Sequence, residues 1–236
     1  MSDTSKPFKY YEFLEACNDT GCPVCRIGAQ TVHRQLKSWF YEYVNDREIR
    51  ASLAKSLGLC SEHTGLLLSY KIADTLGASI IYEHLVKVAL REFPKSGSNA
   101  KELSKKIQSL VSASDGRGEC LACKRRDESI DYTVHHIAGA LDNQTLIKAL
   151  ESSDGVCFTH LSQLLVNLQK QGDVEFLLSL TKNKLESHQA EMAEVIRKND
   201  HRFNSERITD DEAIAWKKAM TLLAGVSINA LGKSHG

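Results

Sequence analysis

The sequence predicts an all-α protein that contains a duplicated helical unit. Apolar residues recur at roughly helical spacing through most of its 236 residues, and no alternating strand pattern of useful length stands out. Only three prolines occur, while the good helix formers Leu, Ala, Lys and Glu are common. In addition, one pattern of cysteines and histidine occurs twice, which indicates that the helical unit itself is repeated.

The repeated pattern is a Cys-x-x-Cys pair followed, more than thirty residues later, by a Cys-x-x-His pair. The intervening segment has 34 residues in the first copy and 33 in the second. Six of the seven cysteines belong to the pattern. Its eight members are Cys22, Cys25, Cys60 and His63 in the first copy, and Cys120, Cys123, Cys157 and His160 in the second.

Three thiolates and one imidazole form the usual closed, tetrahedral ligand set of a structural zinc ion. We therefore expect two Zn²⁺ ions per chain, with each copy of the unit holding one ion through its own four ligands. An iron–sulfur cluster is the alternative cofactor, although clusters more often use four thiolates. A thioredoxin-like redox pair would require a β/α pattern around Cys-x-x-Cys, which the sequence lacks.

The repeat extends beyond the ligands. An offset of 98 residues relates the two Cys-x-x-Cys pairs, and an offset of 97 relates the Cys-x-x-His pairs and several apolar positions. With the second offset Leu53 matches Leu150 and Gly58 matches Gly155. The one-residue gap falls near Val44, where Asn45-Asp46 faces Asp142-Asn143 as a matched helix-start signal. Shared apolar positions imply a shared core, so we interpret the pattern as an internal duplication.

The expected helices follow in order from apolar spacing, caps and glycines. In the first half they cover residues 9–18, 23–44, 46–57 and 60–91, the last with an interruption near Gly77. Residues 94–99 form a linker, residues 100–112 a connecting helix, and residues 114–118 a break. The second half then has helices at 123–141, 144–152, 157–170, 173–200 and 209–225, and residues 233–236 are expected to fray.

These elements suggest a sequential division of the chain. Residues 1–93 form the first helical metal-binding unit, residues 94–119 a linker with the connecting helix, and residues 120–171 the second metal-binding unit. Residues 172–236 supply C-terminal helices that pack across both.

The ligand spacing suits helix starts. Two residues at i and i+3 lie on one helix face, so both can reach one ion. A zinc ion with three thiolates carries a net negative charge, and helix N-termini are the positive ends of the backbone dipole. We expect each site to join the first turns of two helices that lie far apart in the sequence.

Composition limits the function classes. Lys+Arg and Asp+Glu both number 30, and this balance disfavours nucleic-acid binding because such proteins usually carry a basic excess. No apolar stretch is long enough to span a bilayer, and the first residues lack a secretory core. We expect a cytoplasmic protein without membrane contact, whose cysteines stay reduced. Cys17, the seventh cysteine, is left unassigned.

A polar stretch at residues 196–203 offers a second candidate site. Its functional interpretation is a docking or ligand site that uses Arg197, Asp200, His201 and Arg202. The structural interpretation, which we favour, is that cationic residues are stabilising near a helix C-terminus. For Trp216, on the last predicted helix, we expect packing in the core.

The motif order also resembles a known family. The Cys-Pro-Val-Cys pair, the Gly-Leu-Cys-x-x-His pair, their second copies, the stretch Ile-Arg-Lys-x-Asp-x-Arg-Phe and the late Ala-Trp-Lys-Lys-Ala are similar to an uncharacterised prokaryotic family, a domain of unknown function with duplicated cysteine pairs. The resemblance covers about residues 10–225. It implies that residues 196–203 and Trp216 belong to the family pattern, and it brings no established activity.

The sequence thus favours a zinc-binding interaction or adaptor protein without enzymatic activity, whose protein partner the sequence does not name. A redox or iron–sulfur protein that uses the same cysteines is the first alternative. Nucleic-acid binding is the second, and it rests on the basic runs at residues 124–126 and 197–202. No Ser-His-Asp set, phosphate-binding glycine loop or paired-carboxylate motif stands out.

Overall fold

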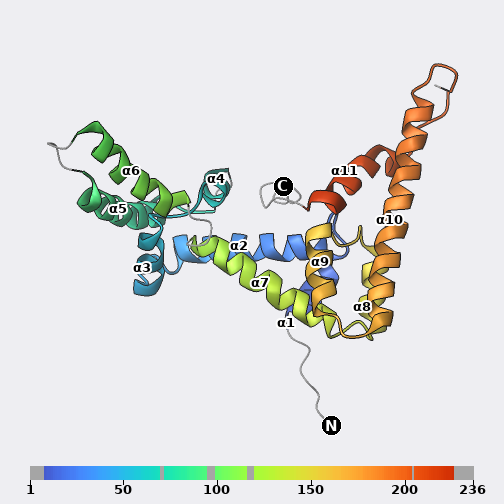
Figure 1. The fold of residues 1–236 in the computed structure, drawn as a ribbon, viewed down its shortest axis with the longest axis horizontal. Coiled ribbons are helices and arrows are strands. Elements are labelled where there is room, and N and C mark those ends of the chain that lie inside the picture. Colours follow the sequence, from blue (N-terminus) through green and yellow to red (C-terminus); the bar gives the residue numbers. More distant parts are fainter. Residues whose placement is uncertain (1–7, 70–71, 95–98, 116–119, 204, 226–236) are drawn as a thin grey trace, which may run out of the picture. The chain divides into compact units, whose positions relative to one another are not determined.

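The computed structural model describes residues 8–69, 72–94, 99–115, 120–203 and 205–225. These residues form eleven α-helices and no strand, which confirms the all-α class (Figure 1). The helices are α1 (Phe8–Ala16), α2 (Pro23–Tyr41), α3 (Arg47–Lys55), α4 (Ser61–Ser69), α5 (Thr75–Glu92), α6 (Ala100–Asp115), α7 (Leu121–Ala138), α8 (Gln144–Ser152), α9 (Phe158–Asn167), α10 (Gln171–Lys198) and α11 (Asp210–Ala224).

Most predicted helices are present within a few residues of their expected bounds, but the one expected at 60–91 is two helices. Helix α4 ends at Ser69, and α5 begins at Thr75. The side chain of Asp74 caps α5 by accepting a hydrogen bond of 2.7 Å from the backbone N–H of Gly77. Gly77 therefore belongs to the first turn of α5 and does not interrupt a helix. The predicted breaks at 94–99 and 114–118, and residues 233–236, fall wholly or largely outside the described residues.

Gly77 permits a close approach of two helices. A Cβ built on it would overlap the carbonyl oxygen of Phe40 in α2 and lie 2.9 Å from that residue's carbonyl carbon. The obstruction is backbone, which cannot rotate away as a side chain can. The first turn of α5 can therefore pack against the end of α2 only with glycine at this position.

We predict that Gly77→Ala destabilises the protein by about 3 kcal/mol, the upper end of typical overpacking costs. The matched control is Gly65→Ala in α4, where a Cβ meets nothing within 4 Å. The control should gain up to about 1 kcal/mol because alanine is the better helix former. Urea unfolding of the three proteins checks both values, and equal midpoints for the two variants would contradict the proposed close approach.

The duplication is visible in local structure. Asp46 caps α3 and Asn143 caps α8, and each side chain accepts hydrogen bonds from the backbone N–H groups two and three residues later. Gly58 and Gly155 both have positive φ, 115° and 96°, in the turn before each Cys-x-x-His pair. These values favour glycine because a Cβ would be strained there. Equivalent positions thus perform equivalent tasks in the two copies.

The described chain forms two compact units that do not follow the sequential division. Among the described residues, unit 1 contains those in 8–27 and 130–225, and unit 2 contains those in 28–129. Helix α2 gives its first turn to unit 1 and the rest to unit 2, while α7 gives its first half to unit 2 and the rest to unit 1. Each unit is therefore built from both halves of the sequence, where the sequence predicted one unit per half.

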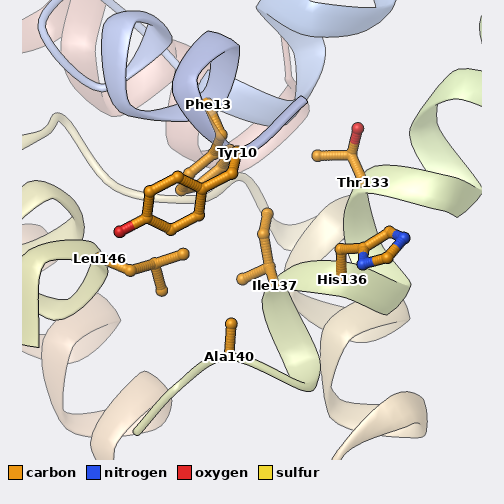
Figure 2. A pocket seen from close by; sticks show the side chains of 7 residues that line it. All are labelled: Tyr10, Phe13, Thr133, His136, Ile137, Ala140 and Leu146. Carbon is orange, nitrogen blue, oxygen red and sulfur yellow. The ribbon is translucent and has the colours of Figure 1, made fainter. Parts of the chain in front are cut away.

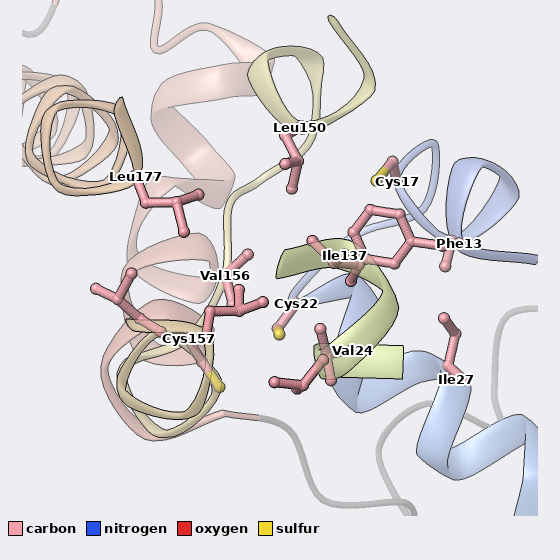
Figure 3. Close-up of a cluster of buried hydrophobic side chains, with 14 of the residues drawn as sticks. Phe13, Cys17, Cys22, Val24, Ile27, Ile137, Leu150, Val156, Cys157 and Leu177 are labelled. Carbon is pink, nitrogen blue, oxygen red and sulfur yellow. The ribbon is translucent and has the colours of Figure 1, made fainter. Parts of the chain in front are cut away.

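Each unit has its own apolar core. In unit 1, side chains of α1 and the start of α2 pack with those of α7, α8, α9 and α10 (Figure 3). Its largest fully buried members are Phe13, Ile27, Leu146, Leu150, Leu164 and Leu177. In unit 2, the rest of α2 packs with α3, α4, α5 and the first turn of α7 around Phe40, Leu36, Leu53, Leu66 and Ile81.

Helices α10 and α11 form a pair within unit 1, in which α11 lies against α10 (Figure 1). A capping box at Thr209 and Glu212 starts α11: the Thr209 hydroxyl accepts from the Glu212 N–H, and the Glu212 carboxylate accepts from the Thr209 N–H. Both helices are assigned to this one unit. None of the described helices has the length and apolar character needed to cross a membrane.

Candidate metal centres

The structure gathers all eight predicted ligands into two sets of four, and the sets cross between the copies. Site 1, in unit 1, combines Cys22 and Cys25 with Cys157 and His160. Site 2, in unit 2, combines Cys120 and Cys123 with Cys60 and His63. The residues and the Cys3His composition are as predicted, but the expected grouping within each copy is corrected: each set takes two ligands from each half.

Site 1 has the dimensions of a single-ion site. The Sγ atoms of Cys25 and Cys157 are 3.8 Å apart. Nδ1 of His160 lies 3.5, 3.4 and 3.2 Å from Sγ of Cys22, Cys25 and Cys157. Cys22, Cys157 and His160 are buried and Cys25 is partly exposed.

Site 2 repeats this arrangement. Sγ of Cys60 lies 3.7 Å from Sγ of Cys123, and Nδ1 of His63 lies 3.1, 3.6 and 3.4 Å from Sγ of Cys60, Cys120 and Cys123. All four residues are buried.

These separations match the edges of a zinc tetrahedron. Zinc–sulfur bonds of about 2.3 Å and zinc–nitrogen bonds of about 2.05 Å give tetrahedral edges of about 3.8 Å between sulfurs and about 3.6 Å between sulfur and nitrogen. A disulfide would instead require about 2.05 Å between sulfurs, and all seven cysteines are free. All four donor atoms of each set lie within 4.8 Å of one another, so each set could hold one ion.

Helix starts position every ligand. The first cysteine of each pair directly precedes a helix: Cys22 before α2, Cys60 before α4, Cys120 before α7 and Cys157 before α9. The carbonyl of each accepts the first hydrogen bond of its helix from the N–H four residues later, at 2.8 to 3.1 Å. The second ligand lies in the first turn. Two positive helix ends thus meet at each set of thiolates, as expected from the i, i+3 spacing.

The length of α2 explains why the sets cross. A helix of 19 residues carries the chain about 28 Å away from Cys22, whereas α3, with nine residues, is only about 13 Å long. Cys60 therefore lies in unit 2 with the far end of α2, while Cys22 stays in unit 1. The same geometry separates Cys120 from Cys157 through α7. Only a helix start from the other half completes each set.

Polar contacts beside the ligands differ between the sites. At site 1, the carboxylate of Asp154 accepts a hydrogen bond of 2.8 Å from the N–H of Gly21 and lies 3.8 Å from Nζ of Lys218 in α11. At site 2, Arg126 of α7 pairs with Glu62 of α4 at 3.6 Å. The sequence repeat did not reveal these contacts, because the position equivalent to Asp154 is Leu57 and the pairs have no counterpart in the other copy.

The pKa values of the ligand side chains reflect their burial and the hydrogen-bonding groups close to them. For Cys120, burial alone would raise the thiol pKa, but hydrogen bonds from His63 and from the backbone N–H groups of Cys60 and Cys123 lower the pKa to about 6. For His160, burial opposes the charged ring, yet the sulfurs of Cys157 and Cys25 raise its pKa to about 9. Thiolate and imidazolium thus stabilise each other, and a metal ion would displace the protons of such a set.

Cys17 belongs to neither set. It is buried in the core of unit 1, and its sulfur lies apart from those of Cys22 and Cys157 (Figure 3). Burial raises the pKa of its thiol to about 12. A buried neutral thiol of this kind is a packing group.

The predicted polar stretch lies at the end of α10 and in the turn toward α11, where its charges pair with one another and with α11. Arg197 contacts Glu194 and Glu206, and its guanidinium lies over the Phe203 ring. Asp200 pairs with Arg202 at 2.7 Å, and His201 is highly exposed at 3.2 Å from Asp200. These contacts stabilise the turn, in line with the structural interpretation.

Two other expectations concern exposed side chains. Trp216 was expected in the core, but 51% of it is exposed, because the buried face of α11 consists of Ala215, Ala219 and Leu222. The basic run at 124–126 is partly neutralised: Arg125 pairs with Glu128, and Arg126 pairs with Asp127 and Glu62. The run therefore presents less positive charge than its sequence suggests.

Unit 1 also contains a small cavity of about 90 Å³ between α1, α7 and α8 (Figure 2). Its lining includes one imidazole and two hydroxyls but no carboxylate, thiol or amine. The residues are Tyr10, Phe13, Thr133, His136, Ile137, Ala140 and Leu146. The Tyr10 hydroxyl donates to Oδ1 of Asn143, the cap of α8, at 3.3 Å. This lining suits packing or a small apolar guest and lacks the paired groups of an acid–base site.

A family comparison adds to these observations. Residues 11–229 match the model of a family described as "Family of unknown function (DUF6062)". The chain belongs to this family. The match covers nearly the whole chain, including both ligand sets, and confirms the resemblance seen in the motif order.

A relative of this family member occurs in Caldicellulosiruptor sp. (strain Rt8B.4), where it is described as "Uncharacterized 23.9 kDa protein in xynA 3'region". The two chains are 26% identical over 213 residues, which cover 90% of this chain and 98% of the relative. No solved structure matches the chain.

Proposed function

We propose that this protein binds two zinc ions in closed, structural Cys3His sites and acts as a non-enzymatic interaction protein in a reducing, cytoplasmic environment. The observation that carries the proposal is the match between the ligand separations and the edges of a zinc tetrahedron in both sites. With four protein donors around each centre, no coordination position is left for a substrate or water.

The same dimensions favour one ion over a cluster. All four donor atoms of each set lie within 4.8 Å of one another. In an iron–sulfur cluster the protein ligands are spread over several irons, so they lie farther apart than the edges of a single-ion tetrahedron. A tetrahedral set of three thiolates and one imidazole is a usual ligand set of structural zinc.

Zinc stoichiometry tests the proposal. We expect two zinc ions per chain by elemental analysis of protein purified without added metal, and no visible absorption band. Cobalt substitution should give the intense bands of thiolate-coordinated, tetrahedral Co²⁺. Iron with a visible spectrum, or protein without metal at full helicity, would reject the proposal.

An exposed stripe on α11 supports a role in protein interaction. Trp216, Met220 and Leu223 follow one another at helical spacing, and each is more than half exposed. Trp is among the residues enriched at binding hot spots, so this stripe is a candidate contact surface for a protein partner.

Photo-crosslinking tests this second part of the proposal. A photoreactive amino acid in place of Trp216 should give a discrete protein adduct in cells, whereas the same amino acid in place of Lys182, an exposed position on α10, should not. Equal labelling from both positions, or none from Trp216, would argue against α11 as a partner surface.

A further inference from the structure

The two sites differ in the exposure of one sulfur. In site 2 all four ligands are buried, whereas in site 1 Cys25 is partly exposed. A solvent-accessible thiolate reacts faster with oxidants and electrophiles than a buried one. The sites therefore share a ligand set but not a reactivity.

The C-terminal end of α11 covers site 1. Gly225 follows the last residue of α11 and has φ of 75°, and a Cβ built on it would lie 3.4 Å from Sγ of both Cys25 and Cys157. Its backbone therefore lies against the two sulfurs. Leu222, one turn earlier, packs against Gly155, two residues before Cys157.

In unit 2, the counterpart of the contact between Leu222 and Gly155 comes from within a helix. Gly58, the counterpart of Gly155, faces the side chains of Tyr82 and Leu85 in α5, at 3.7 and 3.5 Å from a built Cβ. Both lie in the interior of α5, which extends to Glu92. Helix ends open at lower free energy than helix interiors, so the end of α11, which lies against the sulfurs of site 1, opens more easily than the interior of α5.

We propose that site 1 is an oxidant-sensitive zinc site in which Cys25 is the reacting thiolate and the C-terminal end of α11 controls access, while site 2 keeps its ion. This inference rests on the proposed zinc binding. The oxidant is a hydroperoxide, of which hydrogen peroxide is the simplest member.

The chemistry balances with the residues present. The Cys25 thiolate attacks one peroxide oxygen, the O–O bond breaks, and hydroxide leaves, which converts the sulfur to a sulfenic acid. The Cys157 thiolate, 3.8 Å away, then attacks this sulfur and expels a second hydroxide. Two thiolates and one peroxide give one disulfide and two hydroxides. Zinc retains only Cys22 and His160 as ligands and is released.

Loss of this ion would also loosen α11. One loop carries Asp154, which lies beside Lys218 of α11, Gly155, against which Leu222 packs, and the ligand Cys157. Moving Cys157 into a disulfide with Cys25 displaces this loop and the sulfurs on which Gly225 rests. Oxidation at site 1 is thereby coupled to the helix that carries Trp216.

The test treats the zinc-loaded full chain with hydrogen peroxide in the presence of a chromogenic zinc indicator. We expect one of the two ions to be released well before the other, with a disulfide between Cys25 and Cys157 in the peptide map. Thiol reductant and zinc should restore the original content. Equal release from both sites, or earlier oxidation of Cys60, Cys120 or Cys123, would overturn the inference.

A substitution at Gly225 tests whether the end of α11 controls access to site 1. Gly225→Val places a branched side chain against the two sulfurs in a strained conformation, and should accelerate release from site 1 several-fold without changing site 2. The control is Gly172→Ala in α10, where a Cβ meets nothing within 4 Å. An unchanged rate in Gly225→Val would exclude α11 as the cover. Protein that carries no zinc at all would instead reject the proposed function, so the two failures are distinguishable.

Discussion

In the Cys157→Ser variant, Cys22 and Cys25 will become accessible to alkylating reagents, whereas Cys120 and Cys123 will stay protected from them. Cys157 lies 132 residues from Cys25 in the sequence but shares site 1 with it. Removal of one of four donors opens that site, and the remaining thiolates become accessible to alkylation. Zinc content should fall from two ions to one.

The reciprocal variant makes the result specific. Cys60→Ser should expose Cys120 and Cys123 to alkylation and leave Cys22 and Cys25 protected. Cys17→Ser is the control, because Cys17 is a buried cysteine outside both sets, and it should retain both ions. Mass-spectrometric mapping of alkylated peptides decides the outcome. If Cys157→Ser exposed Cys120 and Cys123 instead, the sites would be formed within each half and the crossed arrangement would be wrong.

The loss of stability in each variant should appear in the unit that contains the altered site, and this unit includes residues from both halves of the sequence. Structural zinc contributes on the order of 10 kcal/mol to the folding of small zinc modules, well above the cost of a usual core substitution. In Cys157→Ser, hydrogen exchange should therefore accelerate in unit 1, including α1 at the other end of the chain. In Cys60→Ser it should accelerate in unit 2.

Local signals in the sequence predicted much of this structure. Asp46 and Asn143 marked the starts of α3 and α8, and the structure shows both as side-chain caps. Gly58 and Gly155 were matched by the offset of 97 residues, and the structure gives both a positive φ that favours glycine. These features depend on a few neighbouring residues, so the sequence can reveal them without knowledge of the tertiary fold.

The pairing of the ligands could not be read from residue types. Each Cys-x-x-Cys pair can combine with either Cys-x-x-His pair to give the same Cys3His set, and almost equal spacings in the two copies remove any further distinction. One signal was available in the predicted helix from residue 23 onward. A helix of that length carries the chain too far for the much shorter α3 to return it to Cys22.

Long-range packing explains the remaining differences. Trp216 has apolar neighbours in sequence, and periodicity alone did not show that small residues, Ala215 and Ala219, form the buried face of α11. Asp154 and Gly225 contribute to site 1 through contacts that no repeated motif marks. Such residues are recognised only when the elements they join are known.

Cleavage of the chain between its halves provides the strongest test that each ligand set takes residues from both halves. A specific protease site inserted after Pro94 lies between the end of α5 and the start of α6. We expect the cleaved, zinc-loaded protein to elute at the size of the intact chain with two zinc ions. Each site and each core contains residues from both halves, so neither half can hold a complete set of the observed contacts.

Zinc removal should then separate the cleaved halves under conditions in which the uncleaved chain keeps its halves together. Chelator in moderate urea removes the ions that join the two halves, and the cleaved protein lacks the covalent link that maintains a high effective concentration. Its urea midpoint should therefore fall with dilution, since dissociation accompanies unfolding, whereas the midpoint of the uncleaved control should not. Two fragments that elute apart in the presence of zinc, each with one ion, would show that each half forms its own site and would contradict the crossed architecture.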